Sequence, residues 1–181
     1  MKQSNCLSLD YGAISYYTGY SAKSHYGMEN NVMNYRETML HLNSALNNVD
    51  ALYATIAKKH GLTFNALMMF YLIDEAENIT QKQICEALHL PKSTVHSILL
   101  DFVKQDYATL VDSNNKKEKF IAVTQTGDNY FRDILEETRQ VEQNVLEGLG
   151  EENCTFLTKI ADSVETLVHK EMARIDGSGV K

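Results

Sequence analysis

The sequence lacks several features that mark common protein classes. Its three cysteines, Cys6, Cys85 and Cys154, are odd in number and widely separated, so neither a disulfide framework nor a zinc-binding cysteine pattern is present. No apolar run approaches the roughly eighteen residues of a membrane span. The first twenty residues contain too weak an apolar segment for a secretory signal. Together these features predict a cytoplasmic protein with no membrane partner.

Motifs for enzymatic chemistry are missing too. The chain contains no glycine-rich phosphate loop, nucleophile elbow or His-Glu-x-x-His motif, and its six histidines include no i, i+4 pair. We therefore expect no catalytic residue, no metal site and no cofactor. What remains is an ordinary globular composition, with 44% hydrophobic and 23% charged residues in a chain of 181. That length is enough for one domain with its own core.

The sole proline, Pro91, separates two short helical patterns. Before it, Thr80 and Gln83 form a capping-box pattern that predicts a helix start. After it, apolar residues recur at helical spacing and predict a core-facing side: Val95, Ile98, Leu99 and Phe102. The other side of this second helix carries Lys92, Ser93, Thr94, His96 and Ser97, which suit a helix lying in a DNA major groove. The alternative is an ordinary capped helix pair with a solvated face.

Two β-rich segments follow the helix pair. Residues 107–111 and 120–124 are predicted to be strands, and the polar, lysine-rich loop 112–119 joins them. A short helix, a longer helix and such a hairpin form a winged helix-turn-helix. Residues 62–131 resemble the DNA-binding part of the MarR family of bacterial regulators, through the Lys-Ser-Thr-Val start of the second helix, the hairpin and the Val-Thr-x-x-Gly exit at residues 123–127. The resemblance extends more loosely over residues 31–174.

The resemblance implies a mainly α fold with a small β-hairpin wing. A winged-helix lobe at about 62–126 would join a helical dimerisation lobe built from about 31–60 and 127–174. It also implies a homodimer that binds a pseudo-palindromic site in double-stranded DNA. The expected DNA-binding residues are Lys82, Lys92, Ser93, Thr94, His96, Ser97, Asn114, Asn115, Lys116, Lys117 and Lys119. Outside this domain, residues 1–28 are expected to form an irregular arm and residues 176–181 a disordered tail.

Three positions depart from the family pattern. The wing carries Asn115 and Lys117 where the family usually has Asp-x-Arg, and Ser97 stands where arginine is frequent. Asp106 replaces a glycine at the turn that leaves the second helix. Because lysine and serine lack the planar donors of arginine, DNA specificity is expected to be modest. The alternative function is therefore a winged-helix protein-interaction module with weak or lost specific DNA binding.

The helices outside the winged lobe have apolar seams. From Val32 to Ile56 the apolar positions recur in alternating steps of three and four residues, and the last helix carries a stripe from Phe156 to Val168. Such helices need apolar cover, which a second copy of the chain would supply in the MarR-like reading. Packing within one chain into a monomeric bundle is the alternative.

A regulatory ligand is a further implication of the resemblance. The family commonly binds aromatic ligands between its two lobes, and Tyr53, Met68, Met69 and Tyr71 fall in the corresponding region. The alternative is that these side chains are simply core.

A thiol sensor is less well supported, because Cys6 precedes Val32 by 26 positions and does not align with the sensing position of relatives. The net charge of −7 is unevenly spread, since residues 80–119 contain six lysines against five acidic residues.

Overall fold

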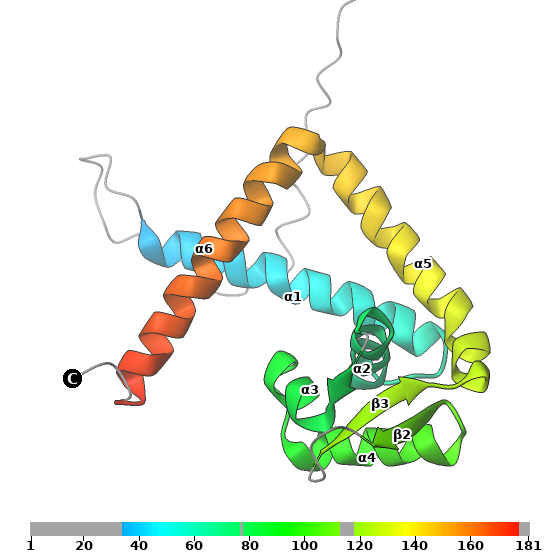
Figure 1. Cartoon of the computed structure of the whole chain (residues 1–181). Coiled ribbons are helices and arrows are strands. Elements are labelled where there is room, and N and C mark those ends of the chain that lie inside the picture. The colour runs from blue at the N-terminus through cyan, green and yellow to red at the C-terminus, as the bar shows by residue number, and fades with distance from the viewer. Residues whose placement is uncertain (1–33, 77, 113–117, 178–181) are drawn as a thin grey trace, which may run out of the picture. The chain divides into compact units, whose positions relative to one another are not determined.

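The computed structural model describes residues 34–76, 78–112 and 118–177. The chain divides after Leu42 into two units, and the packing described below lies within the second unit, residues 43–181. The elements are α1 (Tyr35–Lys59), α2 (Phe64–Glu75), β1 (Ile79–Thr80), α3 (Gln81–Ala87), α4 (Lys92–Lys104), β2 (Ala108–Asp112), β3 (Lys119–Val123), α5 (Gln125–Leu149) and α6 (Glu151–Ile175) (Figure 1).

Helices and one small sheet make up the fold, which confirms the mainly α class with a β wing. The arm predicted for residues 1–28 and the tail beyond Gly177 fall outside the described residues. Within the part of the chain that is described, no helix is long and apolar enough to cross a membrane.

Local capping signals fix where the helices begin and end. The Thr80 hydroxyl accepts a hydrogen bond from the Gln83 amide, and the Gln83 side chain accepts one from the Thr80 amide, which completes the predicted capping box. Thr63 and Thr124 accept the same kind of bond at the starts of α2 and α5. At the end of α1, Gly61 adopts a φ of 72°, which glycine reaches without a steric penalty.

The wing is a three-stranded antiparallel sheet with strand order β1-β3-β2 (Figure 1). β3 lies in the middle, where Ile121 pairs with Ile79 on one side and Leu110 on the other. The two-residue strand β1 was not predicted, since so short a segment carries no alternation. The hairpin strands occupy 108–112 and 119–123 instead of 107–111 and 120–124. The backbone of Tyr107 instead bonds to Phe102 and Thr124, and this links the end of α4 to the start of α5.

The core of the winged lobe is built around α2. Leu67, Met69 and Phe70 are fully buried there. The Phe70 ring stacks on Phe131 of α5 at a centroid distance of 3.6 Å, and Phe102 of α4 meets both rings edge-on. Three helices are thereby joined through one aromatic cluster, which fixes the position of α4 relative to its supports.

Helix α5 contains a glycine near its end. The helix continues past Gly148 to Leu149 and stops at Gly150, whose φ is 86°. A glycine inside a helix costs only about 0.5–1 kcal/mol relative to alanine, so one such residue does not end a helix that is stabilised elsewhere.

Candidate nucleic-acid interface and ligand site

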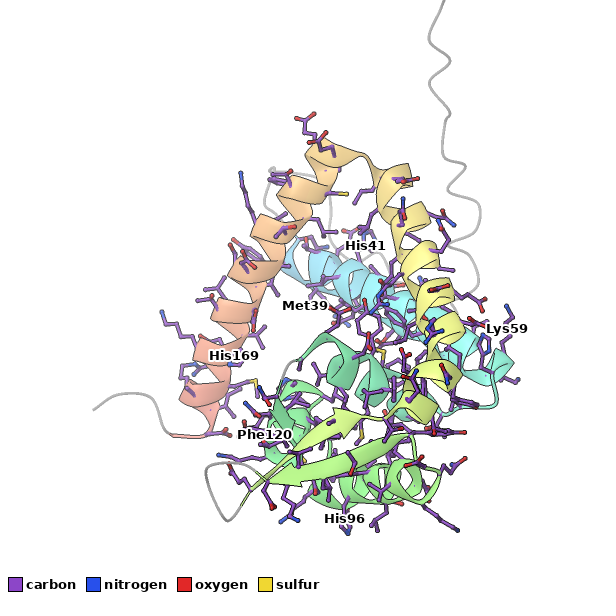
Figure 2. All side chains as sticks on the ribbon, turned by 45° about the vertical axis from the view of Figure 1, so that its right-hand side comes forward. Met39, His41, Lys59, His96, Phe120 and His169 are labelled. Carbon is purple, nitrogen blue, oxygen red and sulfur yellow. The ribbon has the colours of Figure 1, made fainter. Side chains whose placement is uncertain are left out.

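Helix α4 has two chemically distinct sides. Val95, Leu99 and Phe102 are at most 4% exposed and face the core. Lys92, Ser93, His96 and Ser97 are exposed and Thr94 is half-buried. Figure 2 shows His96 on the outer side of the lobe, away from the sheet. The structure thus brings the predicted recognition residues together on one accessible polar surface at the start of α4.

The corner between α3 and α4 is held by contacts that local spacing did not indicate. The Gln81 side chain donates to the carbonyl of Lys92 at 3.4 Å, and the Leu90 amide donates to Cys85. His89 takes a positive φ of 50° in this corner. Gln81 was missed as a positioning residue because its partner lies 11 residues away. Lys82 lies on the exposed side of α3, 3.7 Å from Glu86.

Part of the wing tip lies outside the residues that the structure describes. Asn114, Asn115, Lys116 and Lys117 are not among the described residues. Lys119 is exposed at the start of β3, and its ammonium lies 3.5 Å from the carboxylate of Asp112, its neighbour across the hairpin. An exposed pair of this kind stabilises little, so it leaves Lys119 able to exchange Asp112 for a phosphate.

The base of the wing explains how the chain tolerates Asp106 in place of glycine. Asp106 has the expected left-handed backbone, with a φ of 57°. Its carbonyl accepts a hydrogen bond from the Thr124 hydroxyl, and its carboxylate accepts one from Thr126 at 2.9 Å. The side-chain bond to Thr126 is one that glycine could not make, and it offsets part of the backbone strain.

A shared carboxylate joins three helices on the other side of the lobe. Tyr53 of α1 donates to Glu142 Oε1 at 2.6 Å, and Tyr71 of α2 donates to Glu142 Oε2 at 3.1 Å. Burial, followed by the bond to Glu142, raises the pKa of both phenols above the usual value. The two tyrosines of the predicted ligand site therefore meet on α5. Met69, by contrast, is fully buried in the core, and Met68 is half-buried on the same helix.

Two further ion-pair groups connect α5 to its neighbours. Arg139 contacts Asp74 at 2.7 Å and Glu75 at 2.8 Å, and its guanidinium lies 5.8 Å from the centre of the Tyr71 ring. Two residues earlier, Glu137 accepts hydrogen bonds from Lys59 and His60 at the end of α1. Figure 2 marks Lys59 at this end. The bonds from Lys59 and then His60 hold the pKa of Glu137 below its usual value.

A hollow of about 490 Å³ opens beside Glu142, where α5 turns into α6. Its lining is formed by Arg139, Glu142, Gln143, Leu146, Glu147, Glu151 and Cys154. Tyr53 and Tyr71 reach the same carboxylate that lines this hollow. Within the described residues, no group of three metal-ligating side chains comes together anywhere.

The end of α5 and the whole of α6 expose an apolar surface. Helix α6, which the structure describes completely, buries none of its residues. The exposed large apolar side chains here are Val145, Leu146, Leu149, Phe156, Leu157, Ile160, Leu167, Val168, Met172 and Ile175. An apolar surface of this extent usually marks an interaction site in a stable protein.

Comparison with known proteins agrees with this geometry. The family model described as the MarR family matches residues 60–117, which begin directly after α1 and end between β2 and β3. The winged-helix region thus resembles the MarR family. The sequence has no significant match among curated proteins.

Solved structures extend the likeness from this region to most of the chain. A MarR family regulator from Neisseria meningitidis is 20% identical with a TM-score of 0.66, and the match covers 76% of this chain and 97% of that one. MarR from Staphylococcus aureus, in complex with salicylate and kanamycin, is 16% identical with a TM-score of 0.62, over 75% and 93%. NadR in complex with 4-hydroxyphenylacetate is 16% identical with a TM-score of 0.61, over 77% and 97%. The chain thus has the fold of MarR family regulators.

Proposed function

We propose that the chain is a cytoplasmic DNA-binding transcriptional regulator of the MarR type, which binds a pseudo-palindromic site as a homodimer. The observation that carries this proposal is the two-sided α4. Its apolar side is locked into the aromatic core, while Ser93, His96 and Ser97 stand exposed on a rigid helix. A helix presented in this way can enter a major groove without any rearrangement of the lobe.

The remaining predicted contacts support phosphate binding around this helix. Lys82 and Lys92 are exposed on α3 and at the start of α4, and Lys119 is exposed at the base of the wing. In the proposal, Asn114, Asn115, Lys116 and Lys117 extend this surface at the wing tip. Lysines of this kind position a protein on the duplex, while the short side chains of α4 supply the sequence readout.

Homodimer formation is supported by the apolar stripe of α6. Helix α6 carries exposed Phe156, Ile160 and Leu167, yet it is long and buries nothing within the chain. Burying such a stripe against a second copy would stabilise it by about 25 cal/mol for each Å² of apolar surface removed from water. A homodimer would also place two α4 helices on the two half-sites of a pseudo-palindrome.

Modulation by a small aromatic ligand is part of the same proposal. Two structures with this fold hold small aromatic acids, salicylate in one and 4-hydroxyphenylacetate in the other. In this chain Tyr53 and Tyr71 meet Glu142 where α1, α2 and α5 pack together. The hollow at the turn from α5 to α6 is lined by the same Glu142. A ligand that shifts this junction would change the position of the winged lobe relative to the dimer helices.

A protein-interaction module is the second candidate, and the charge of the lobe favours it. Residues 78–123 contain no arginine, and Lys82 and Lys119 each lie beside a carboxylate, Glu86 and Asp112. Such a surface would release fewer counterions on binding DNA than an arginine-rich one.

Footprinting on the DNA upstream of the chain's own gene and its neighbours separates the two candidates. A regulator should protect a two-fold site against excess competitor DNA, with an affinity that falls linearly on a log–log plot against salt. If competitor DNA abolished the binding at every salt concentration, the protein-interaction module would be favoured.

A further inference from the structure

We propose that the hollow between α5 and α6 selects a protonated amine with an apolar or aromatic body, in preference to an aromatic acid. This inference rests on the proposed ligand response and names the charge of its ligand. The central residue is Glu142. Its two carboxylate oxygens accept hydrogen bonds from Tyr53 and Tyr71, and its side chain also lines the hollow.

An aromatic acid would find its natural partner already engaged. Of the described residues that line the hollow, Arg139 carries the only positive charge. Its guanidinium is held by Asp74 at 2.7 Å and Glu75 at 2.8 Å. Both bonds use one nitrogen of Arg139, so an incoming carboxylate could still reach the other N–H groups. It would, however, bring a third negative charge to a guanidinium whose single positive charge is already balanced by two carboxylates.

Two basic side chains at the end of α1 are engaged by another carboxylate. Lys59 and His60, at the end of α1, both contact Glu137, at 2.6 Å and 2.7 Å. Glu137 lies five positions before Glu142 on α5, so these groups neutralise their own carboxylate and not the hollow.

The lining itself carries excess negative charge. Glu142, Glu147 and Glu151 oppose the single Arg139, which is itself paired outside the hollow. The phenols on Glu142 are neutral donors, because burial keeps their pKa high and their protons in place. They orient the carboxylate without cancelling its charge. A concave surface lined by one sign of charge concentrates ligands of the opposite sign.

Apolar surface lies beside the carboxylates. Leu146 is 45% exposed, and half-buried Cys154 lies next to it, with its thiol 3.3 Å from the Leu146 carbonyl. A ligand can therefore place its ammonium group at Glu142 and its ring against Leu146. Phosphates and sugar acids fit neither part of this surface.

Tyramine and 4-hydroxyphenylacetate form a matched pair of probes, since both have a phenol ring and a two-carbon chain and they differ in the charge at its end. Isothermal titration of the full chain with each compound should give at least about tenfold tighter binding of tyramine, because attraction in one complex becomes repulsion in the other. High salt should reduce the ratio of the two affinities, because it screens the charges. Equal or tighter binding of 4-hydroxyphenylacetate, or no tyramine binding at millimolar concentration, would overturn the inference.

Glu142→Gln tests which carboxylate is responsible. The amide keeps an oxygen acceptor for a phenol and removes the charge, so the preference for tyramine should fall by about fivefold or more. Glu136→Gln, an exposed carboxylate on α5 that does not line the hollow, should leave the preference unchanged. A full preference in Glu142→Gln would contradict the assignment. If Glu142→Gln fails to fold, the wild-type comparison decides alone.

These titrations contain no DNA, so they are independent of whether the chain binds an operator. A protein that prefers 4-hydroxyphenylacetate and still protects DNA in a footprint would retain the proposed function and lose this inference. A protein that prefers tyramine but protects no DNA would lose the regulator proposal and keep the selectivity of the hollow.

Discussion

Tyr53 and Glu142 lie 89 positions apart in the chain, and their side chains meet at 2.6 Å. The second oxygen of the same carboxylate accepts from Tyr71 at 3.1 Å. Glu142 is therefore the common acceptor of α1 and α2, and a ligand ammonium at this carboxylate would share its oxygens with both phenols. This makes the junction of α1, α2 and α5 sensitive to a single contact.

Replacement of Tyr53 by phenylalanine should reduce stability in a pH-dependent way. Burial and the bond to Glu142 raise the pKa of Tyr53 above its ordinary value of 10.0. The folded protein then keeps a proton that the unfolded chain loses, so the contribution of Tyr53 is full below pH 10.0 and declines as the pH rises above it. Urea unfolding at about pH 8 and about pH 11 should show a smaller alkaline loss in Tyr53→Phe. Tyr35→Phe, at a position 77% exposed, should behave like wild type.

Glu137 should control stability at the acid end. Hydrogen bonds from Lys59 and then His60 lower the pKa of Glu137 below its ordinary value of 4.5. The unfolded chain therefore takes up a proton before the folded protein does, and the stabilisation is present above pH 4.5 and lost as the pH falls below it. Glu137→Gln should flatten the decline in unfolding free energy between neutral and acid pH, while the exposed Glu136→Gln should not. An unchanged slope in Glu137→Gln would show that the cluster does not stabilise the fold.

Local signals predicted most of the fold. Thr80 begins its helix as expected, since a cap depends on residues within one turn. The two sides of α4 also followed from spacing, because a buried helix side repeats every three to four residues. The two β-rich segments predicted the bounds of β2 and β3 to within one residue.

The site depends on partners that spacing cannot reveal. Arg139 meets Asp74 and Glu75 from 65 and 64 positions away, and Gln81 meets the Lys92 carbonyl across the corner before α4. Such contacts exist only once the helices pack, so Glu142 and Arg139 looked like ordinary surface charges in the sequence. Met69 is fully buried, which agrees with the alternative that this side chain is simply core.

Gly127 should tolerate no side chain. A Cβ at this position would lie 2.0 Å from the Tyr107 carbonyl oxygen, a backbone atom with little room to move. Gly127→Ala should therefore destabilise the protein by more than about 2 kcal/mol, measured by urea unfolding. Gly148, also in α5, meets nothing within 4 Å. Gly148→Ala should instead stabilise by about 0.5–1 kcal/mol, and a destabilising result there would mean that α5 does not persist as a helix to Leu149.

Charges on the apolar stripe of α6 should prevent association. Ile160 and Leu167 are 42% and 60% exposed in the single chain, and the proposed dimer would bury them. The double variant Ile160→Asp, Leu167→Asp should be monomeric or unfolded in sedimentation experiments at micromolar concentration. Thr158→Asp, on the opposite side of α6, should remain dimeric. A well-folded wild-type monomer at the same concentration would exclude the homodimer.

Substitution of His96 on α4 tests the proposed recognition helix directly. Ser93, Thr94 and Ser97 are short and neutral, so His96 is the residue among the readers with a planar edge that can reach into a groove. Each good direct contact discriminates against a wrong base by about 1–3 kcal/mol, so His96→Ala should lower the preference for operator over scrambled DNA by about fivefold to a hundredfold. Binding to scrambled DNA should change little, because the lysines that contact phosphate are untouched.

His169→Ala on α6 is the matched control. Competition titrations at one fixed salt concentration measure both quantities. If His96→Ala kept the full operator preference, α4 would not be the reader, and the protein-interaction module would become the better account of this lobe.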